Sequence, residues 1–412
     1  ERAVRLDDLF TLETPLHPAL APDGESLVYV QRRMNLAENR YEADLWLMSW
    51  DGSKKRQLTR GTARHLSPAW HPRGRHLAYI AIEPQQSPQI WILPLEGGEP
   101  WPLTSLGGGP VRDLCWSPDG KWLLFGHRSE PRIPEEERQR RPAYKHITQL
   151  HHKLDGDGFY PAERWHLFRV AFAPSQPGRA RRAEQLTKGP QDDQDGRFSP
   201  DGRHIVFVSN RMPDADLHPD NSDLFVITAS GRGLRQITKR FGPIATPAWS
   251  LDGSGLYYIG HFGREGEWLR HPQHIYHIEI SSGRTRDLTP RLDNWPFNRL
   301  TADTGPGGAN LLHVYREPAA GPSERVALLV NEEGAVRLYS ISGGHARKRI
   351  APRLESPGRI NVYAAHGTSE SSRMVIAASH MTDAGDLYRI ALDGSGELGR
   401  LTHINRRVMS RW

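Results

Sequence analysis

The sequence has almost no cysteine, which limits both its covalent chemistry and its compartment. Cys115 is the only cysteine among 412 residues, so no disulfide can form within the chain. Asn-x-Ser/Thr acceptor sites for glycosylation are also absent. Both absences are expected of a protein that works in the reducing cytoplasm. We therefore expect a cytoplasmic location.

Long apolar runs and clustered basic charge are missing as well. No apolar stretch approaches the length that crosses a bilayer, which argues against an integral membrane protein. The net charge of +6 comes mainly from arginines scattered over turns and strand ends, and even the basic stretch RIPEEERQRRP contains three glutamates. Nucleic-acid binding needs basic residues clustered among aromatic ones. We therefore expect neither a membrane nor a nucleic-acid partner.

Glycine and proline are abundant, and they recur in a repeated phrase. The chain has 39 Gly and 32 Pro, which favours an all-β protein with frequent turns. A turn of the type Ser-Pro-Asp-Gly followed by an apolar strand occurs at 21–30, 71–80, 115–125 and 199–208. Asp-Gly and Gly-Gly pairs supply the positive φ that tight hairpins require. The phrase therefore predicts a hairpin that is repeated along the chain.

A second mark, a Leu-Thr or Ile-Thr pair, closes each repeat. The pairs end at Thr59, Thr104, Thr187, Thr238, Thr289 and Thr402. The long interval between the last two pairs corresponds to two repeats, with Ser340 at the end of the first. Four-stranded antiparallel sheets at such a period are typical of propeller blades. The repeats predict seven four-stranded blades in a ring closed by packing, without strand exchange, over residues 18–60, 61–105, 106–188, 189–239, 240–290, 291–341 and 342–403. In this interpretation Trp70, Trp116, Trp249 and the Leu-Thr pairs are architectural.

Three segments lie outside this pattern. Leu6, Leu9 and Phe10 have helical spacing, which predicts a short amphipathic helix within residues 1–17, ending near Pro15. Residues 404–412 follow the last strand without a turn signal and are expected to form a linker. The third repeat carries an insertion over 128–164.

The insertion is the best candidate for a functional element. We expect Tyr144, Asp155, Asp157 and Arg164 to line a substrate entrance. His146, His151 and His152 do not predict a metal site, because adjacent residues of a strand point to opposite faces. The DGDG stretch at 155–158 lacks the further carboxylates of a calcium loop and predicts a tight turn.

The repeats together with the LDDLF opening and the segment HHKLDGDGFYPAERWHLFRV resemble the amino-terminal propeller of prolyl-oligopeptidase-family serine peptidases, acylaminoacyl-peptidase branch. The resemblance covers essentially the whole chain. It implies a lid that restricts access of short peptides to a Ser–Asp–His triad in an α/β-hydrolase domain beyond this chain. Residues 1–17 would pack on that domain and 404–412 would lead to it. It implies no cofactor, and it leaves homo-oligomer formation open.

No catalytic residues are expected in this chain itself. A serine hydrolase of this type needs a G-x-S-x-G pentapeptide between a strand and a helix. That pentapeptide is absent, and the LDGSGLY and LDGSGEL stretches predict hairpin turns. We therefore expect the chain alone to be inactive.

Two other readings remain open at this point. The first is a non-catalytic TolB-like propeller that acts as a protein-interaction scaffold. The second is an enzyme acting in its own central channel, such as a glycosidase or lactonase, which would need inward-facing carboxylates or metal ligands. The innermost strands carry Asp113 and Asp195 as the only such candidates.

Overall fold

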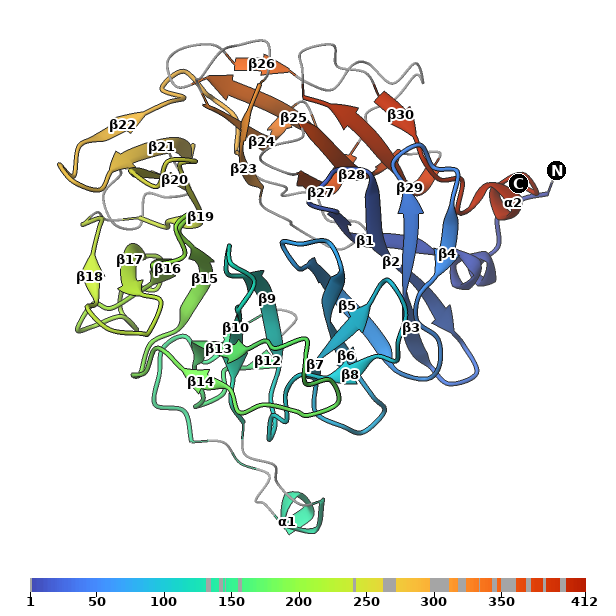
Figure 1. Cartoon of the computed structure of the whole chain (residues 1–412), viewed down its shortest axis with the longest axis horizontal. Coiled ribbons are helices and arrows are strands. Elements are labelled where there is room, and N and C mark those ends of the chain that lie inside the picture. Colours follow the sequence, from blue (N-terminus) through green and yellow to red (C-terminus); the bar gives the residue numbers. More distant parts are fainter. Residues whose placement is uncertain are drawn as a thin grey trace.

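The computed structural model describes the chain as a ring of β-sheets around a central axis (Figure 1). No helix in the described part is long and apolar enough to cross a membrane. The described residues are 2–130, 135–140, 144, 146–154, 158–239, 242–261, 272–296, 311–317, 324–332, 334–342, 347–349, 361–367, 372–380, 383–392 and 398–412.

Three of the sheets have four antiparallel strands each. The first contains β9 (Val111–Trp116), β10 (Trp122–Arg128), β13 (Trp165–Ala171) and β14 (Glu184–Gln185). The second contains β15 (Asp193–Phe198), β16 (His204–Ser209), β17 (Asp223–Thr228) and β18 (Arg235–Gln236). The third contains β19 (Ala245–Trp249), β20 (Gly255–Gly260), β21 (His274–Glu279) and β22 (Thr285–Asp287).

Two larger sheets have eight strands each. One contains β1 (Thr14–Leu20), β2 (Ser26–Asn35), β3 (Arg40–Ser49), β4 (Lys55–Gln57), β5 (Arg64–Trp70), β6 (His76–Ile82), β7 (Gln89–Pro94) and β8 (Trp101–Pro102). The other contains β23 (Leu312–Arg316), β24 (Glu324–Glu332), β25 (Ala335–Ser342), β26 (Arg347–Arg349), β27 (Asn361–Gly367), β28 (Arg373–His380), β29 (Asp383–Ala391) and β30 (Leu398–Arg400).

The prediction of seven separate four-stranded blades is therefore wrong, because the described strands form five blade sheets. Parallel bridges produce the difference: Ala43 pairs with Arg64 between β3 and β5, and Val336 pairs with Asn361 between β25 and β27. The sequence repeats mark hairpins, which are local. A lateral bridge between two successive repeats leaves no such mark, so the repeat count overestimates the number of sheets.

The two ends of the ring meet through side chains. Among the described strands, β1 pairs with β2, and no ladder joins β1 to β27–β30. The Tyr363 hydroxyl donates to the Pro15 carbonyl at 3.0 Å, and the Leu20 N–H donates to His366 Nδ1 at 3.1 Å. Side chains of both ends, including Leu16 and Val375, share one buried cluster. Packing of this kind joins the first and last sheets.

Short helices lie at both ends of the chain. The predicted amphipathic helix is a 3₁₀-helix, η1 (Leu6–Thr11), which ends before β1 reaches Pro15. The carboxyl-terminal residues form α2 (Arg406–Met409). Glu13 and Asn405 exchange two hydrogen bonds, at 2.9 and 2.8 Å, so the two terminal segments lie side by side.

The repeated turn phrase acts through its serine and aspartate. In the third repeat the Ser117 hydroxyl donates to Asp119 at 2.6 Å, and the Lys121 N–H donates to the same carboxylate at 3.0 Å. These two hydrogen bonds, that from Ser117 first, lower the pKa of Asp119. The same serine–aspartate bond recurs at Ser199 and Ser250. The phrase is therefore a hairpin device, as its sequence predicts.

The Leu-Thr pairs are structural too. In each of six repeats the threonine hydroxyl accepts the N–H of an apolar residue on the third strand, at 2.9–3.0 Å. The threonines are buried, and buried polar groups are stable only when hydrogen-bonded. The pairs are Leu45–Thr59, Ile90–Thr104, Leu167–Thr187, Leu224–Thr238, Ile275–Thr289 and Leu387–Thr402.

Neighbouring repeats are also joined at their turns. Gly120 has a φ of +73°, and its carbonyl lies 3.1 Å from His71 Nε2 of the preceding repeat. Because His71 Nδ1 accepts the Arg73 N–H, Nε2 is the nitrogen that donates to Gly120. Burial lowers the pKa of His71 and keeps the ring neutral for this role.

This contact predicts a difference between two equivalent glycines. We expect Gly120→Ala to lower the free energy of unfolding by at least about 2 kcal/mol more than Gly74→Ala, as measured by urea denaturation. A Cβ at Gly120 would lie 2.2 Å from His71 Nε2, whereas one at Gly74 would meet nothing within 4 Å. Both glycines have nearly the same φ, +73° and +71°, so both substitutions introduce equal backbone strain. Equal losses for the two variants would contradict this packing.

Candidate functional site

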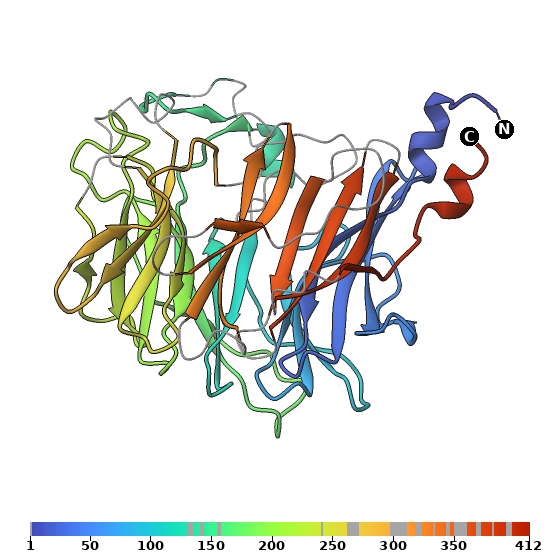
Figure 2. The same ribbon diagram turned by 90° about the horizontal axis from the view of Figure 1, so that it is seen from above.

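Both termini and the insertion lie at one end of the ring, which we call the terminal face. Figure 2 shows η1, α2 and the described parts of residues 129–164 at the same end. Strand direction explains this placement. The first strand of each repeat runs toward the Pro-Asp-Gly type of turn at the opposite end, and the second strand returns. Segments that follow a second strand therefore emerge at the terminal face.

The insertion leaves and re-enters the ring at adjacent positions. β10 and β13 pair along their whole length, with Arg128 opposite Trp165. Between them lie α1 (Glu135–Arg140), β11 (Lys153–Leu154) and β12 (Gly158–Phe159). The centre of the Trp165 ring lies 3.8 Å from the Arg112 guanidinium, and the backbone N–H of Trp165 donates to the Asp192 carboxylate at 2.7 Å. The base of the insertion is thus held by strands on either side.

The residues predicted to line a substrate entrance are only partly placed. Tyr144 is 76% exposed, and the Arg164 guanidinium lies 5.9 Å from the centre of the Tyr160 ring. The structure describes no contact between Tyr144 and Arg164. Asp155 and Asp157 lie outside the described residues. The entrance stays a prediction.

Sequence reasoning missed the residue that attaches the insertion to the ring. The Asp216 carboxylate accepts the N–H groups of Leu150 and His151, at 2.7 and 3.1 Å. These two bonds lower the pKa of Asp216. Asp216 belongs to the loop between β16 and β17, in the next repeat, and nothing in its local sequence marks it. The contact between Asp216 and the insertion depends on how the fold places the loop between β16 and β17 beside residues 150–151.

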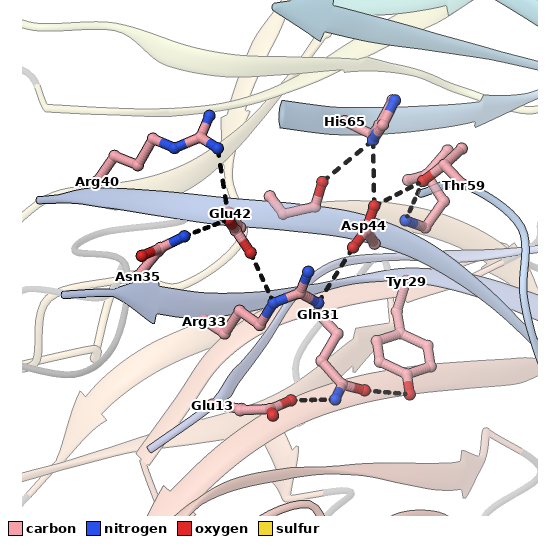
Figure 3. Close-up of polar contacts among 12 residues, drawn as sticks. Glu13, Tyr29, Gln31, Arg33, Asn35, Arg40, Glu42, Asp44, Thr59 and His65 are labelled. Carbon is pink, nitrogen blue, oxygen red and sulfur yellow. Dashed lines mark hydrogen bonds and ion pairs between the residues drawn. The ribbon is translucent and has the colours of Figure 1, made fainter. Parts of the chain in front are cut away.

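A dense polar network lies on the terminal side of β2, β3 and β5 (Figure 3). Arg33 bridges two carboxylates, with Glu42 at 2.9 Å and Asp44 at 3.2 Å. Asn35 donates to Glu42 at 2.8 Å, and this bond, followed by that from Arg33, lowers the pKa of Glu42. His65 lies 3.4 Å from Asp44, whose side chain is 2% exposed. The network holds charged groups in a fixed arrangement.

The network continues toward the junction of the first and last sheets. Gln31 donates to Glu13 and accepts from the Tyr29 hydroxyl, the second bond being 3.0 Å long (Figure 3). Burial raises the pKa of Tyr29 far above its usual range, with the negative charge of Glu13 as a further cause. Tyr29 is therefore a neutral hydrogen-bond donor. The bonds of this network join residues of β2, β3 and β5 to Glu13, just before β1.

The central channel is lined by residues with left-handed backbone. His17, Ser67, Asp113, Asp195 and Thr246 have φ between +44° and +57° and occupy corresponding positions in five innermost strands. Asp195 accepts the Thr246 N–H at 3.3 Å, and Ser67 donates its N–H to His17 at 3.2 Å. Bonds of this kind connect one innermost strand to the next. The positions are therefore structural.

Each of the two channel carboxylates has a partner within the ring, and Arg112 lies 3.3 Å from Asp113. Burial raises the pKa of Asp113, an effect that the charge of Arg197 partly offsets. Asp195 is engaged by the Thr246 N–H. No group of three or more His, Cys, Asp or Glu residues in the described part could hold a metal ion. Nothing described in the channel favours a glycosidase or lactonase.

No family model matches the chain, but individual proteins do. The chain is 26% identical over 348 residues to the uncharacterized peptidase YuxL of Bacillus subtilis, a match covering 83% of the chain and 50% of that protein. It is 25% identical over 246 residues to dipeptidyl-peptidase 5 of Porphyromonas endodontalis, covering 57% of the chain and 35% of that protein. The chain thus spans half or less of these relatives.

A solved structure matches nearly the whole chain. The acylaminoacyl peptidase of Pyrococcus horikoshii superposes with a TM-score of 0.69 over 99% of this chain and 56% of its own, at 15% identity. The TM-score establishes a shared fold. The resemblance predicted from the repeats and the third-repeat segment is thereby confirmed: the chain has the propeller fold found in the acylaminoacyl peptidase, and the two relatives in sequence named above are peptidases.

Proposed function

We propose that this chain is the propeller domain of a serine peptidase of the prolyl-oligopeptidase type, and that it restricts access to the catalytic domain to short peptides. The catalytic triad would lie in an α/β-hydrolase domain on the carboxyl side of residue 412. Support comes from these two relatives, which are peptidases about two to three times as long as the regions matched. We place the protein in the cytoplasm, because its single cysteine fits a reducing compartment.

The observation that carries the proposal is the uncovered apolar surface at the terminal face. Val4, Leu6 and Leu9 are 58%, 77% and 42% exposed, and Phe10 is 37% exposed. Neighbouring large apolar side chains with this exposure usually mark a contact surface. The bonds between Glu13 and Asn405 place this surface beside the end of the chain. We infer that residues 1–17 pack on the hydrolase domain and that 404–412 lead into it.

Gating by the ring follows from this arrangement. A hydrolase domain seated on the terminal face would be reached through the channel or past the insertion. Tyr144, Asp155, Asp157 and Arg164 of the insertion would then line that entrance. Enclosure of this kind excludes folded proteins by size and lets short peptides pass.

The test uses the longer protein that contains this chain. Cleavage of a short chromogenic peptide and of a folded protein is compared with and without residues 18–403. We expect the whole enzyme to cleave only the peptide, and the enzyme without the ring to lose that preference. An unchanged size preference would disprove gating. A reading frame that ends without a hydrolase domain would instead favour a non-catalytic scaffold.

A further inference from the structure

A cavity of about 400 Å³, lined mostly by apolar atoms and flanked by two arginines, opens where the first two sequence repeats meet. It lies at the terminal face, beside the bridge between Ala43 and Arg64 that joins β3 to β5. Its walls come from the start of β3, the start of β5 and the loop after β6. The lining residues are Arg40, Tyr41, Thr62, Arg64, Ile82, Glu83, Pro84, Gln85 and Gln86.

Two guanidinium groups line this cavity, and neither is fully used. Arg40 lies 3.5 Å from Glu42 (Figure 3). It donates to the Thr62 carbonyl at 2.9 Å, and its Nε is buried without a hydrogen-bond partner. Arg64 is exposed, and no carboxylate in the described part of the chain pairs with it. An arginine has five N–H donors in a planar fork. The exposed Arg64 guanidinium therefore offers unused donors to the cavity, and Arg40 adds its positive charge.

The charge of the lining favours an anion. Arg40 and Arg64 contribute two positive charges, and Glu83 is the one carboxylate among the lining residues. Glu42 is already committed to Arg33 and Asn35. A ligand entering the cavity therefore meets a net positive wall. Coulomb attraction near a protein surface is several times stronger than in bulk water.

The loop that closes the cavity is strained. Gln85 has a φ of +61°, in the left-handed region that residues other than glycine rarely adopt. A turn fixes this shape, since the Gln86 N–H donates to the Glu83 carbonyl at 3.1 Å. Strained backbone persists where the surrounding structure determines it, and it is frequent at ligand sites. The loop brings the polar side chains of Gln85 and Gln86 to the cavity.

We propose that Arg40 and Arg64 form a carboxylate-binding subsite for peptides at the terminal face. A carboxylate matches the planar fork of a guanidinium and accepts two hydrogen bonds from it. The cavity is within the size range of small-ligand sites. The choice of peptides as the carboxylate source rests on the proposed function. The carboxylate would belong to a free carboxyl terminus or to an acidic side chain.

The experiment measures peptide binding to the purified chain by isothermal titration calorimetry. The probes are tetra-alanine with a free carboxyl terminus, its amide, and the amide of a tetrapeptide with one glutamate. Arg64→Gln is the test variant and Arg60→Gln the matched control, because Arg60 is exposed, four residues earlier and outside the cavity lining. We expect the acid to bind at least tenfold more tightly than the amide, and Arg64→Gln to lose about that factor.

Each outcome bears on the subsite. Tight binding of the glutamate probe supports a site that reads acidic side chains, and tight binding of the acid alone supports a site for carboxyl termini. Equal binding of acid and amide, no binding of any probe, or equal losses in both arginine variants would overturn it. Binding is measured without catalysis, so a failed gating test leaves this result intact.

Discussion

Replacing Asp386 by alanine is expected to lower the free energy of unfolding by about 2–4 kcal/mol. Asp386 lies on β29, and 1% of it is exposed. Its carboxylate accepts the Ile404 N–H at 2.9 Å and the Thr402 hydroxyl, and it forms an ion pair with Arg400. Alanine would leave the buried Thr402 hydroxyl and the partly buried Ile404 N–H without their acceptor, whereas Arg400 would keep Asp383 as a partner. The loss is measured by urea denaturation.

Asp383 provides the matched control for this prediction. It also pairs with Arg400, at 2.6 Å, but its side chain is 19% exposed. Water can replace the lost partner there, so Asp383→Ala should cost about 1 kcal/mol or less. Asp386→Asn keeps an acceptor for Thr402 and Ile404. Its loss of unfolding free energy should therefore fall between those of Asp386→Ala and Asp383→Ala. If Asp386→Ala cost no more than Asp383→Ala, the carboxylate would not be the centre of this network.

The hairpins could be predicted from the sequence because their causes are local. The phrase around Ser117 and Asp119 contains every group that closes the turn. The Leu-Thr pairs mark a hydrogen bond between two strands of one repeat, about fifteen residues apart. The number of sheets could not be predicted in the same way. It depends on the Ala43–Arg64 and Val336–Asn361 bridges, which join one repeat to the next.

For the candidate sites too, features within one repeat could be predicted from the sequence and contacts between repeats could not. The sequence points to the insertion through its length and composition, yet Asp216, which anchors it, belongs to another repeat. The cavity between Arg40 and Arg64 was also missed, because each arginine is unremarkable in its own strand. Contacts between repeats require the twist and spacing of the ring, and these are properties of the whole fold. Sequence patterns reveal what lies within a repeat.

One contact between repeats does have a sequence signature, the tryptophan of the third repeat. We expect Trp116→Ala to cost about 3–5 kcal/mol of unfolding free energy. Trp116 is 8% exposed and packs edge-on against His71 and Phe172, with ring centres 4.9 and 5.0 Å away. Its Nε1 donates to the Ala69 carbonyl of the preceding repeat at 3.0 Å. The indole therefore joins two repeats by packing and by a hydrogen bond.

Trp116→Phe separates these two contributions. The phenyl ring keeps most of the packing but leaves the Ala69 carbonyl without its donor, so we expect a loss of about 1–2 kcal/mol. The same bond recurs from Trp70 to Ala19 and from Trp249 to Arg197, whereas Phe198 occupies the corresponding place in the fourth repeat. The propeller already contains one phenylalanine at this position of a repeat, so it should tolerate a second. Trp122→Ala is the comparison, because this partly buried tryptophan packs under Arg169 of its own sheet and against a cluster shared with the following repeat. Equal losses for Trp116→Ala and Trp122→Ala would show that the hydrogen bond from Trp116 to Ala69 contributes nothing beyond ordinary burial.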